Sequence, residues 1–315
     1  MTTDINQLLR DVVDSQPFRR VRQVSFLGIV DRFVSSSHHA HKPSSRAEHS
    51  LGVLNIGIRI ARQTEMSQSD AAHLFVACLV HDIGHPPFSH SLEYAYPRTQ
   101  RQFDHHEILR EMLVAPVGAE RQLSRVMDRH GVSVERVYSI VDGSDDLSFL
   151  FNSPINIDTI DGISRSMWSF GLRPTYDLNA LVVMLSSIYR GNAVDSWNVL
   201  RHADLFWKDK GEFYRFLNST HQVAAAERKF QSVVRRYVPC LERRHFALTD
   251  GEFVLRYPQV FTDVMYEEDT GPIATTQSFV IDSSVQMVDR DSVKSRYRRV
   301  RHEVRGPAEQ VSVSH

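Results

Sequence analysis

Residues 71–90 read AAHLFVACLVHDIGHPPFSH, and this stretch decides the fold. Its first half is apolar with a spacing of three and four residues, which is the pattern of a helix with a buried face. The positions that carry the pattern are Ala71, Leu74, Phe75, Cys78 and Leu79. Such a run is too short to span a bilayer, which takes about 20 residues. The sequence therefore predicts a buried helix that leads into the segment VHDIGHPPFSH.

That segment combines a helix end with metal-binding side chains. Gly84 is expected to supply a left-handed C-cap, and Pro86-Pro87 prevents the helix from continuing. Neighbouring residues of a helix project about 100° apart. His81 and Asp82 therefore suit two adjacent ligands on one metal ion that keeps open positions.

Capping chemistry locates four helix starts. Ser45-Arg-Ala-Glu48 forms a capping box, in which each end residue bonds the backbone of the other. Ser67-Gln-Ser-Asp70 and Asp104-His-His-Glu107 begin two further helices. Ser153-Pro154 predicts a fourth, because proline fits best at the first helical position.

The wider pattern predicts a mostly α fold. Helical spacing extends from about residue 46 to 250, whereas alternation appears only in EFVLRYPQVF (252–261) and TTQSFVIDSSVQMVDRD (275–291). Alternation of this kind indicates two to four short strands. We therefore expect a helical domain over residues 1–250 and a small α+β appendage over residues 251–315, which carries a basic tail.

Further metal ligands can be proposed from helical spacing. His49 lies in the first turn of its helix and shares a face with Arg46. Asp158, Asp161 and Arg165 lie on one face of a later helix. Taken singly, a helical histidine is usually a satisfied polar residue, and Asp161 can simply pair with Arg165. Their joint pattern with the segment at 81–90 indicates a site.

Two imidazoles and two carboxylates restrict the identity of the metal. This mixed set suits one divalent ion, Mn²⁺, Mg²⁺, Fe²⁺, Co²⁺ or Zn²⁺, with water in the remaining positions. A structural zinc site would prefer thiolates and a closed shell. An ion with open positions can bind a phosphoryl oxygen and acidify a water.

The composition is ordinary except for its histidines. The chain has 315 residues, 42% of them hydrophobic, and its 37 Lys and Arg nearly balance its 38 Asp and Glu. This excludes a disordered chain and a general electrostatic footprint for nucleic acid. Ten of the 16 histidines lie between residues 38 and 106. Three of them, His38, His39 and His41, lie in a Ser-rich segment that we expect to form a loop over the pocket mouth.

Nothing in the sequence predicts export or membrane insertion. Two cysteines make no disulfide framework, which fits a reducing compartment. The first residues, MTTDINQLLRDVVD, lack the basic and apolar regions of a signal peptide. We therefore expect a cytoplasmic protein with no membrane partner.

The motifs RAEHSLGV, HDIGHPPFSH, DHHE and NIDTID resemble the HD-domain deoxynucleoside triphosphate triphosphohydrolases. These comprise the bacterial dGTPase-like enzymes and the SAM- and HD-domain dNTPases, and the resemblance covers about residues 20–170. It implies an HD-domain helical bundle over residues 1–250, with its metal motifs in 46–166. It also implies hydrolysis at the α-phosphorus, which releases a nucleoside and triphosphate.

The resemblance also implies roles for individual residues. The divalent metal would be held by His49, His81, Asp82 and Asp158. His85 and His90 would be the histidines inside the site, supported by His106 and Glu93, and Arg46 would contact phosphate. A proton for the leaving 5′-oxygen is expected from His90, with His85 as the alternative, because histidine can hold a proton near neutral pH.

The sequence departs from the family around the expected substrate. Thr159 and Gly162 stand where these dNTPases often carry a phosphate-binding lysine and a tyrosine under the sugar, and Ser166 replaces an acidic residue. Asp161 and Arg165 remain expected substrate contacts. A later segment, residues 213–238, weakly resembles the helix that borders the nucleotide, and there Phe230 and Gln231 are expected beside the base.

Three functions fit these observations. The first is a dNTP triphosphohydrolase, and the second is an HD phosphomonoesterase or phosphodiesterase, which Thr159 and Gly162 favour. The third is a regulatory protein that binds a nucleotide or nucleic acid through the basic tail, residues 290–305. A homo-oligomer is expected as well. Base preference, the native metal and the pathway do not follow from the sequence.

Overall fold

The computed structural model describes residues 4–33, 43–268 and 275–303. The expected loop histidines, His38, His39 and His41, lie outside the described residues. The α-helices are α1 (Ile5–Asp14), α2 (Gln16–Val21), α3 (Ile29–Phe33), α4 (Arg46–Gln63), α5 (Gln68–Val80), α6 (Ser89–Tyr94), α7 (His105–Val114), α8 (Arg121–Arg129), α9 (Val134–Asp142), α10 (Phe149–Asn152), α11 (Ile157–Ser169), α12 (Leu178–Tyr189), α13 (Trp197–Ser219), α14 (His221–Tyr237), α15 (Arg243–Phe246), α16 (Asp250–Arg256), α17 (Pro258–Tyr266) and α18 (Arg290–Arg296). Short 3₁₀ turns lie at Arg98–Gln100, Gly118–Glu120 and Asp146–Ser148. The two strands are β1 (Thr275–Ile281) and β2 (Tyr297–Glu303).

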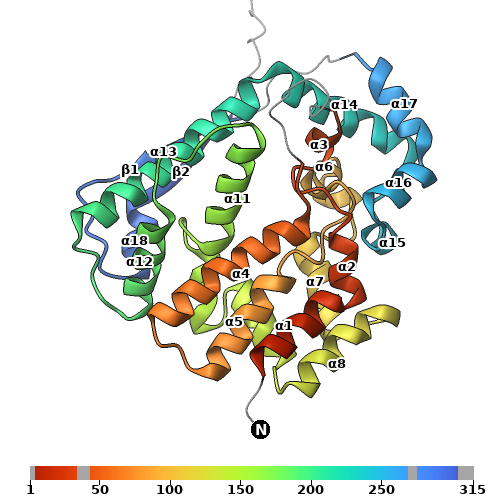
Figure 1. Cartoon of the computed structure of the whole chain (residues 1–315). Coiled ribbons are helices and arrows are strands. Elements are labelled where there is room, and N and C mark those ends of the chain that lie inside the picture. Colours follow the sequence, from red (N-terminus) through yellow and green to blue (C-terminus); the bar gives the residue numbers. More distant parts are fainter. Residues whose placement is uncertain (1–3, 34–42, 269–274, 304–315) are drawn as a thin grey trace, which may run out of the picture.

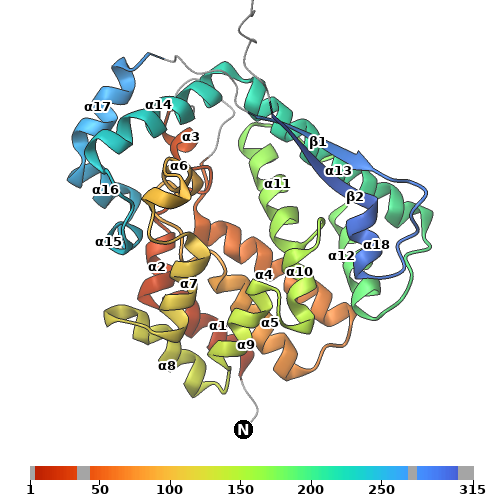
Figure 2. The ribbon, with the colours of Figure 1, turned by 180° about the vertical axis from the view of Figure 1, so that it is seen from behind.

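The mostly α fold class is confirmed. Helices α4 and α5 pack against each other in the middle of the molecule, and α11 packs against α4 (Figure 1). The strands β1 and β2 form a two-stranded antiparallel sheet, connected through α18, and β1 packs along α13 (Figure 2). None of the helices in the described residues has the length and hydropathy needed to span a bilayer.

Three of the four predicted helix starts are confirmed. Ser45 and Asp104 form capping boxes with Glu48 and Glu107, and Ser67 caps α5. The fourth prediction is wrong, because Ser153 ends α10 and the next helix begins at Ile157. Its cap is Asn156, whose side chain accepts a hydrogen bond from the backbone of Thr159. This capping box fixes the first turn of α11, which carries Asp158.

The strand predictions were partly wrong. Residues 252–261 form parts of α16 and α17, because Thr249 and Glu252 make a capping box and Pro258 occupies the first position of α17. The prediction for 275–291 was correct only for β1. Its partner β2 lies in the basic tail, with Phe279 opposite Arg299 and Ile281 opposite Tyr297.

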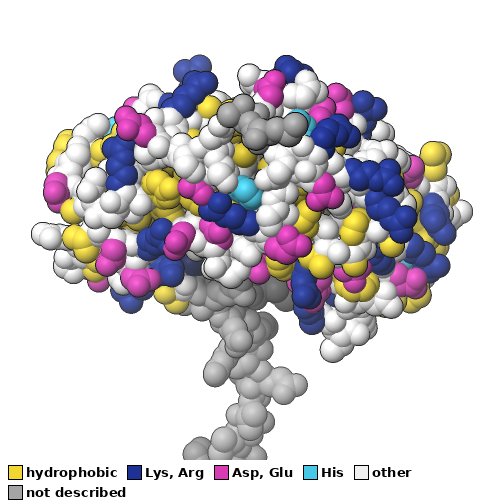
Figure 3. All heavy atoms as spheres, turned by 90° about the horizontal axis from the view of Figure 1, so that it is seen from below, with side chains coloured by type: hydrophobic (Ala, Val, Ile, Leu, Met, Phe, Trp, Pro, Cys, Tyr) yellow, Lys and Arg dark blue, Asp and Glu magenta, His cyan; other side chains and the backbone are white. Residues whose placement is uncertain are grey.

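The appendage shares the core of the helical part. Phe253, Val260, Met287 and Tyr297 belong to the same buried cluster as residues of α4 and α5. The boundary near residue 250 stays a prediction. One basic-tail residue has a structural role, because Arg296 is buried and pairs with Asp204 at 2.8 Å. One face of the molecule mixes basic and acidic side chains, in keeping with the balanced composition (Figure 3).

Candidate metal centre

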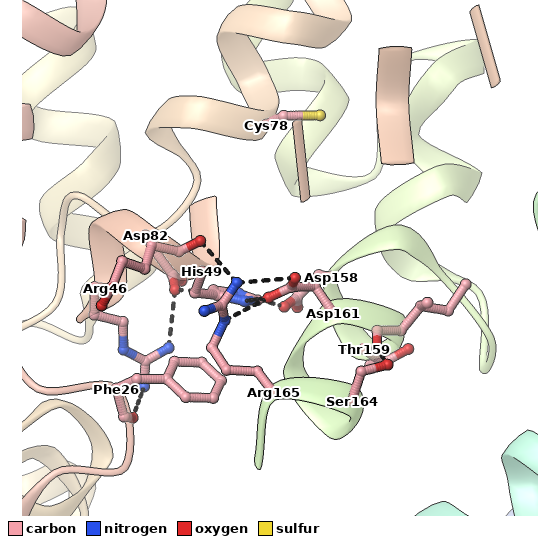
Figure 4. A network of polar contacts seen from close by, with 12 residues as sticks. Phe26, Arg46, His49, Cys78, Asp82, Asp158, Thr159, Asp161, Ser164 and Arg165 are labelled. Atoms are coloured by element: carbon pink, nitrogen blue, oxygen red, sulfur yellow. Dashed lines mark hydrogen bonds and ion pairs between the residues drawn. The ribbon is translucent and has the colours of Figure 1, made fainter. Parts of the chain in front are cut away.

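Three helix ends bring four predicted metal ligands together. His49 comes from the first turn of α4, and Asp158 from the first turn of α11. His81 and Asp82 directly follow α5. Because α4 packs on both α5 and α11, these side chains point toward one another (Figure 4 labels three of the four). The cluster His49, His81 and Asp158 is able to hold a metal ion.

The distances fit a single ion. His49 Nε2 lies 3.0 Å from Asp158 Oδ1 and 3.3 Å from His81 Nε2. The oxygens Oδ2 and Oδ1 of Asp82 lie 3.6 Å from the Nε2 atoms of His49 and His81, respectively. Adjacent ligand atoms on an octahedral ion with bonds of about 2.1 Å are about 3.0 Å apart. His49, His81 and Asp158 therefore match neighbouring positions on one ion, and the carboxylate of Asp82 lies beside them.

Hydrogen bonds orient both imidazoles toward this point. Nδ1 of His49 donates to Asp161 Oδ2 at 2.8 Å, and Nδ1 of His81 donates to the Cys78 carbonyl at 2.9 Å. In each ring, Nε2 is therefore the atom that faces the carboxylates. Metal-binding histidines are commonly held in this way by a carboxylate or a backbone carbonyl.

The electrostatics of the cluster demand a positive charge. Burial alone would raise the pKa of Asp158, but the hydrogen bond from His49 and the nearby imidazoles lower that pKa to about 2. Burial likewise works against a charged His49, yet the hydrogen bonds to Asp158 and Asp161 raise its pKa to about 9. A proton on His49 supplies this positive charge, and a bound metal ion would displace the proton.

Arg46 acts on Asp82 rather than facing solvent. It is buried, and its Nη1 donates to Asp82 Oδ2 at 2.8 Å. Its Nε donates to Ser89 Oγ at 2.8 Å and its Nη2 to the Phe26 carbonyl at 3.1 Å. Three of the five guanidinium N–H donors thus bond protein groups, and one of them orients Asp82, while the expected phosphate contact of Arg46 stays a prediction.

Asp161 and Arg165 form a second pair of side chains that orients a predicted metal ligand, His49. Asp161 holds His49, and Arg165 donates to both Asp161 oxygens at 2.8 and 3.1 Å (Figure 4). Arg165 also donates to the Glu48 carbonyl at 2.8 Å, which ties α11 to α4. The structure therefore joins this pair to the metal cluster through His49, and the substrate contact expected of both residues stays a prediction.

A group of histidines lies beside Asp82. His85 Nε2 is 3.3 Å from Asp82 Oδ1, and its ring stacks on His105 at 4.1 Å and meets His90 edge-on at 4.6 Å. Burial, followed by the charges of Arg46 and His105, holds the pKa of His85 well below its usual value despite Asp82. His85 is therefore a neutral imidazole at neutral pH. Burial also lowers the pKa of His90.

Glu93 supports these histidines through His105, a residue to which sequence reasoning gave no role. Its Oε2 accepts from His105 Nδ1 at 2.8 Å and lies 3.7 Å from His90 Nδ1. His106, the predicted support, is exposed and touches only the edge of this group through the ring of His105 at 4.0 Å. A signal was present in the sequence: Ile108, Leu109 and Met112, which are buried, lie three, four and seven positions after His105. Helical spacing therefore places His105, not His106, on the buried face.

The turn between His85 and His90 has a strained backbone, and contacts with distant segments hold it in place. Phe88 and Ser89 have φ of 55° and 50°, which is rare for residues with a side chain. The Phe88 ring is buried against Phe230 at 5.8 Å and Phe261 at 5.4 Å, and its N–H donates to Asp250 at 2.8 Å. The α16 region thus holds the turn in place, a contact between distant segments that no local motif indicates.

The two residues expected beside the base, Phe230 and Gln231, both contact other protein side chains. Phe230 has no exposed surface, so it packs in the core beside Phe88 and does not border a pocket. Gln231 hydrogen-bonds Glu227 on the same helix. Gly84 also differs from expectation, because its φ is not positive. It is instead a point of close approach, where a Cβ would lie 2.1 Å from the His105 carbonyl oxygen.

Comparisons with known proteins agree with this geometry. Residues 46–143 match the model of the HD domain. The uncharacterized protein YwfO of Bacillus subtilis is 26% identical over 172 residues, which cover 53% of this chain and 37% of that protein. The uncharacterized protein MJ1154 of Methanocaldococcus jannaschii is 40% identical over 83 residues, which cover 26% of this chain and 17% of that protein.

A similarity to an enzyme also exists. The deoxynucleoside triphosphate triphosphohydrolase SAMHD1 of Mus musculus is 27% identical over 206 residues, which cover 62% of this chain and 29% of that protein. The chain thus spans less than two-fifths of the length of each of these three relatives. Residues 46–143 thus match the HD domain, in a chain that resembles the deoxynucleoside triphosphate triphosphohydrolase SAMHD1 of Mus musculus.

Proposed function

We propose that the chain is a metal-dependent phosphohydrolase whose substrate is a dNTP, cleaved to a deoxynucleoside and triphosphate. The observation that carries this proposal is the meeting of two imidazole Nε2 atoms and two carboxylates beside His85 and His90. The similarity to mouse SAMHD1, a deoxynucleoside triphosphate triphosphohydrolase by name, supports the choice of substrate.

In this proposal His49, His81, Asp82 and Asp158 hold one divalent ion. When bound, the ion supplies a Lewis acid for a phosphoryl oxygen and lowers the pKa of a water. Asp161 keeps Nε2 of His49 directed at the ion, and Arg46 fixes the orientation of Asp82. In these two roles both act through a ligand.

His90 is assigned as the proton donor to the leaving 5′-oxygen. Its side chain is 40% exposed, whereas that of His85 is 1% exposed and already lies against Asp82. Its lowered pKa leaves it neutral in the free protein, but a bound phosphate anion raises the pKa of a nearby imidazole. The carboxylate of Glu93, which lies near Nδ1 of His90, also raises the pKa of His90. His85 then positions the phosphate or the attacking water.

A second candidate is an HD phosphomonoesterase or phosphodiesterase. The observation that favours it is the absence of a cation at Thr159 and of an aromatic ring at Gly162, where a triphosphate and a deoxyribose would need them. Cytoplasmic location, a homo-oligomer and a nucleic-acid contact through residues 290–305 stay predictions.

A substrate panel tests the proposal. The full chain is incubated with dNTPs, NTPs, dNMPs and cyclic dinucleotides in Mn²⁺, Mg²⁺, Co²⁺ or Zn²⁺, and the phosphate products are separated by chain length. We expect triphosphate from a dNTP, and none from Asp82→Ala. Turnover of monophosphates or cyclic dinucleotides alone would favour the second candidate, and no turnover of any nucleotide with any metal would refute both.

A further inference from the structure

Among the described residues, no carboxylate pairs with one buried lysine that lies outside the metal cluster. Lys210, on α13, is 7% exposed, and within the described residues its ammonium has one hydrogen bond, to the Pro154 carbonyl at 3.3 Å. An ammonium group has three donors. A buried charge is costly unless it is paired. The position therefore suits an anion that is not part of the protein.

Lys210 lines a cavity of about 320 Å³ that holds further cations. Its other lining residues include Asn152, Ser153, Lys294, Tyr297 and Arg299, and none of the lining residues is acidic. The ring of Trp207 lies 5.0 Å from the Lys210 ammonium and closes one side. The cavity thus combines three cations with polar groups and an aromatic wall.

The cations of this cavity are largely free to bind a ligand. Lys294 has an exposed ion pair with Asp291 at 3.4 Å, which is worth little in water. Arg299 is exposed and forms no ion pair with any described residue. Burial, and then the charge of Arg299 against the pull of Asp158, brings the pKa of Lys210 to about 8. At neutral pH the ammonium is still charged, and a bound anion would hold it so.

The cavity lies near the start of the helix that carries Asp158. Ser153 and Pro154 line it and lie directly before α11, whose first turn carries Asp158. The negative charge of the Asp158 carboxylate raises the pKa of the Lys210 ammonium. Strand β1 packs along α13 and pairs with β2, which carries the cavity residue Arg299 (Figure 2). Cations from the C-terminal region therefore stand beside the helix that has Thr159 in place of a lysine.

We propose that Lys210, Lys294 and Arg299 bind the terminal phosphates of the nucleotide while its α-phosphate is at the metal. The inference rests on the proposed function and deepens it, because it assigns triphosphate recognition to residues of α13, α18 and β2. The cavity fits a polyphosphate as its ligand. Both the phosphate tail of a nucleotide and free inorganic polyphosphate have this chemistry.

Binding of inorganic tripolyphosphate tests the cavity without any need for turnover. The full chain, stripped of metal beforehand, is titrated calorimetrically, and quenching of Trp207 gives a second readout. We expect Lys210→Gln and Arg299→Gln each to weaken binding about 10- to 100-fold, the value of a charge-assisted hydrogen bond. Lys208→Gln is the matched control, because Lys208 is exposed on the same helix, and it should bind as the wild type does.

Folding of the variants is checked by thermal unfolding. If Lys210→Gln does not fold, Lys210→Met replaces it, since an apolar residue at a buried charged position is often neutral or stabilising. Wild-type protein that binds no tripolyphosphate at millimolar concentration, or a folded Lys210 variant that binds it with wild-type affinity, would overturn the proposal.

Nucleotide measurements separate this inference from the proposed function. Wild-type protein should bind a dNTP more tightly than the matching dNMP, and Lys210→Gln should remove most of that difference. If the wild type hydrolyses no nucleotide but these binding differences hold, the proposed function fails and the phosphate site stands. If a dNTP is hydrolysed but does not compete with tripolyphosphate, the assignment to the nucleotide tail is wrong.

Discussion

The contact between α4 and α11 permits a sharp test of how His49 is held. A Cβ at Gly52 would lie 1.8 Å from Asp161 Oδ1, 2.5 Å from Asp161 Cγ and 2.7 Å from Arg165 Nη2. Ordinary contact begins at 3.4 Å, so the carboxylate would have to move by about 1.6 Å in the variant Gly52→Ala. It would then lose its 2.8 Å hydrogen bond to Nδ1 of His49.

The expected loss follows from that one bond. A hydrogen bond to a charged group contributes roughly 1.5–3 kcal/mol, and loss of such a support typically weakens metal binding about 10- to 100-fold. We expect Gly52→Ala to weaken Mn²⁺ binding by this factor in a calorimetric titration. Helix propensity works in the opposite direction for stability, since Ala is preferred over Gly by up to about 1 kcal/mol.

Gly162→Ala is the matched control, because it is also helical and adjoins the same histidine. Its Cβ would meet Phe26 Cζ at 3.6 Å and His49 Cε1 at 3.9 Å, which are ordinary contacts. It should keep wild-type metal affinity and match or exceed wild-type stability. Gly52→Ala protein that is folded and binds Mn²⁺ within twofold of the wild type would refute the reasoning.

Three further predictions concern other parts of the molecule. Burial raises the pKa of Glu227 to about 7 despite hydrogen bonds from Ser91 and Gln231, so between about pH 4.5 and 7 the folded chain keeps a proton that the unfolded chain loses. The free energy of unfolding should therefore fall by up to roughly 3 kcal/mol as the pH rises through this window. Urea unfolding at several pH values should show this fall in the wild type and not in Glu227→Gln. An equal dependence of the unfolding free energy on pH in both proteins would count against the prediction. His105→Asn should lower turnover at least tenfold by releasing Glu93, whereas His106→Asn should change it less than threefold; equal effects in steady-state kinetics would reject this assignment. Gly84→Ala should destabilise the fold by about 1–3 kcal/mol, because its Cβ meets the backbone of α7; an unchanged melting temperature would show that α7 can shift freely.

Local chemistry in the sequence was enough to predict the starts of α4, α5 and α7, but not the start of α11. The capping boxes at Ser45 and Asp104 act within one turn, and so they could be identified without any tertiary information. The strand prediction for 252–261 was wrong because the capping box at Thr249 and the proline at 258 begin helices there in spite of the alternating apolar residues. In that segment the helix-start signals decide the local structure.

The supports of the site were harder to predict, because they depend on which distant segments meet. Arg46 bonds Asp82 and Ser89 only once α4 lies against the end of α5. Lys210 lies far from the metal motifs in sequence, and only the packing of α13 brings it near Asp158. Sequence spacing can therefore propose ligands within one helix, but it cannot assign the partners that orient them.

The most direct test of the central claim is a count of bound metal. Chelator-stripped full-length chain is titrated with Mn²⁺, and free Mn²⁺ is followed by electron paramagnetic resonance. We expect one ion per chain, and we expect binding to be weakened at least 100-fold in both Asp82→Asn and Asp158→Asn. No bound ion in the wild type, or wild-type binding in either folded variant, would contradict the claim that these side chains form a metal centre.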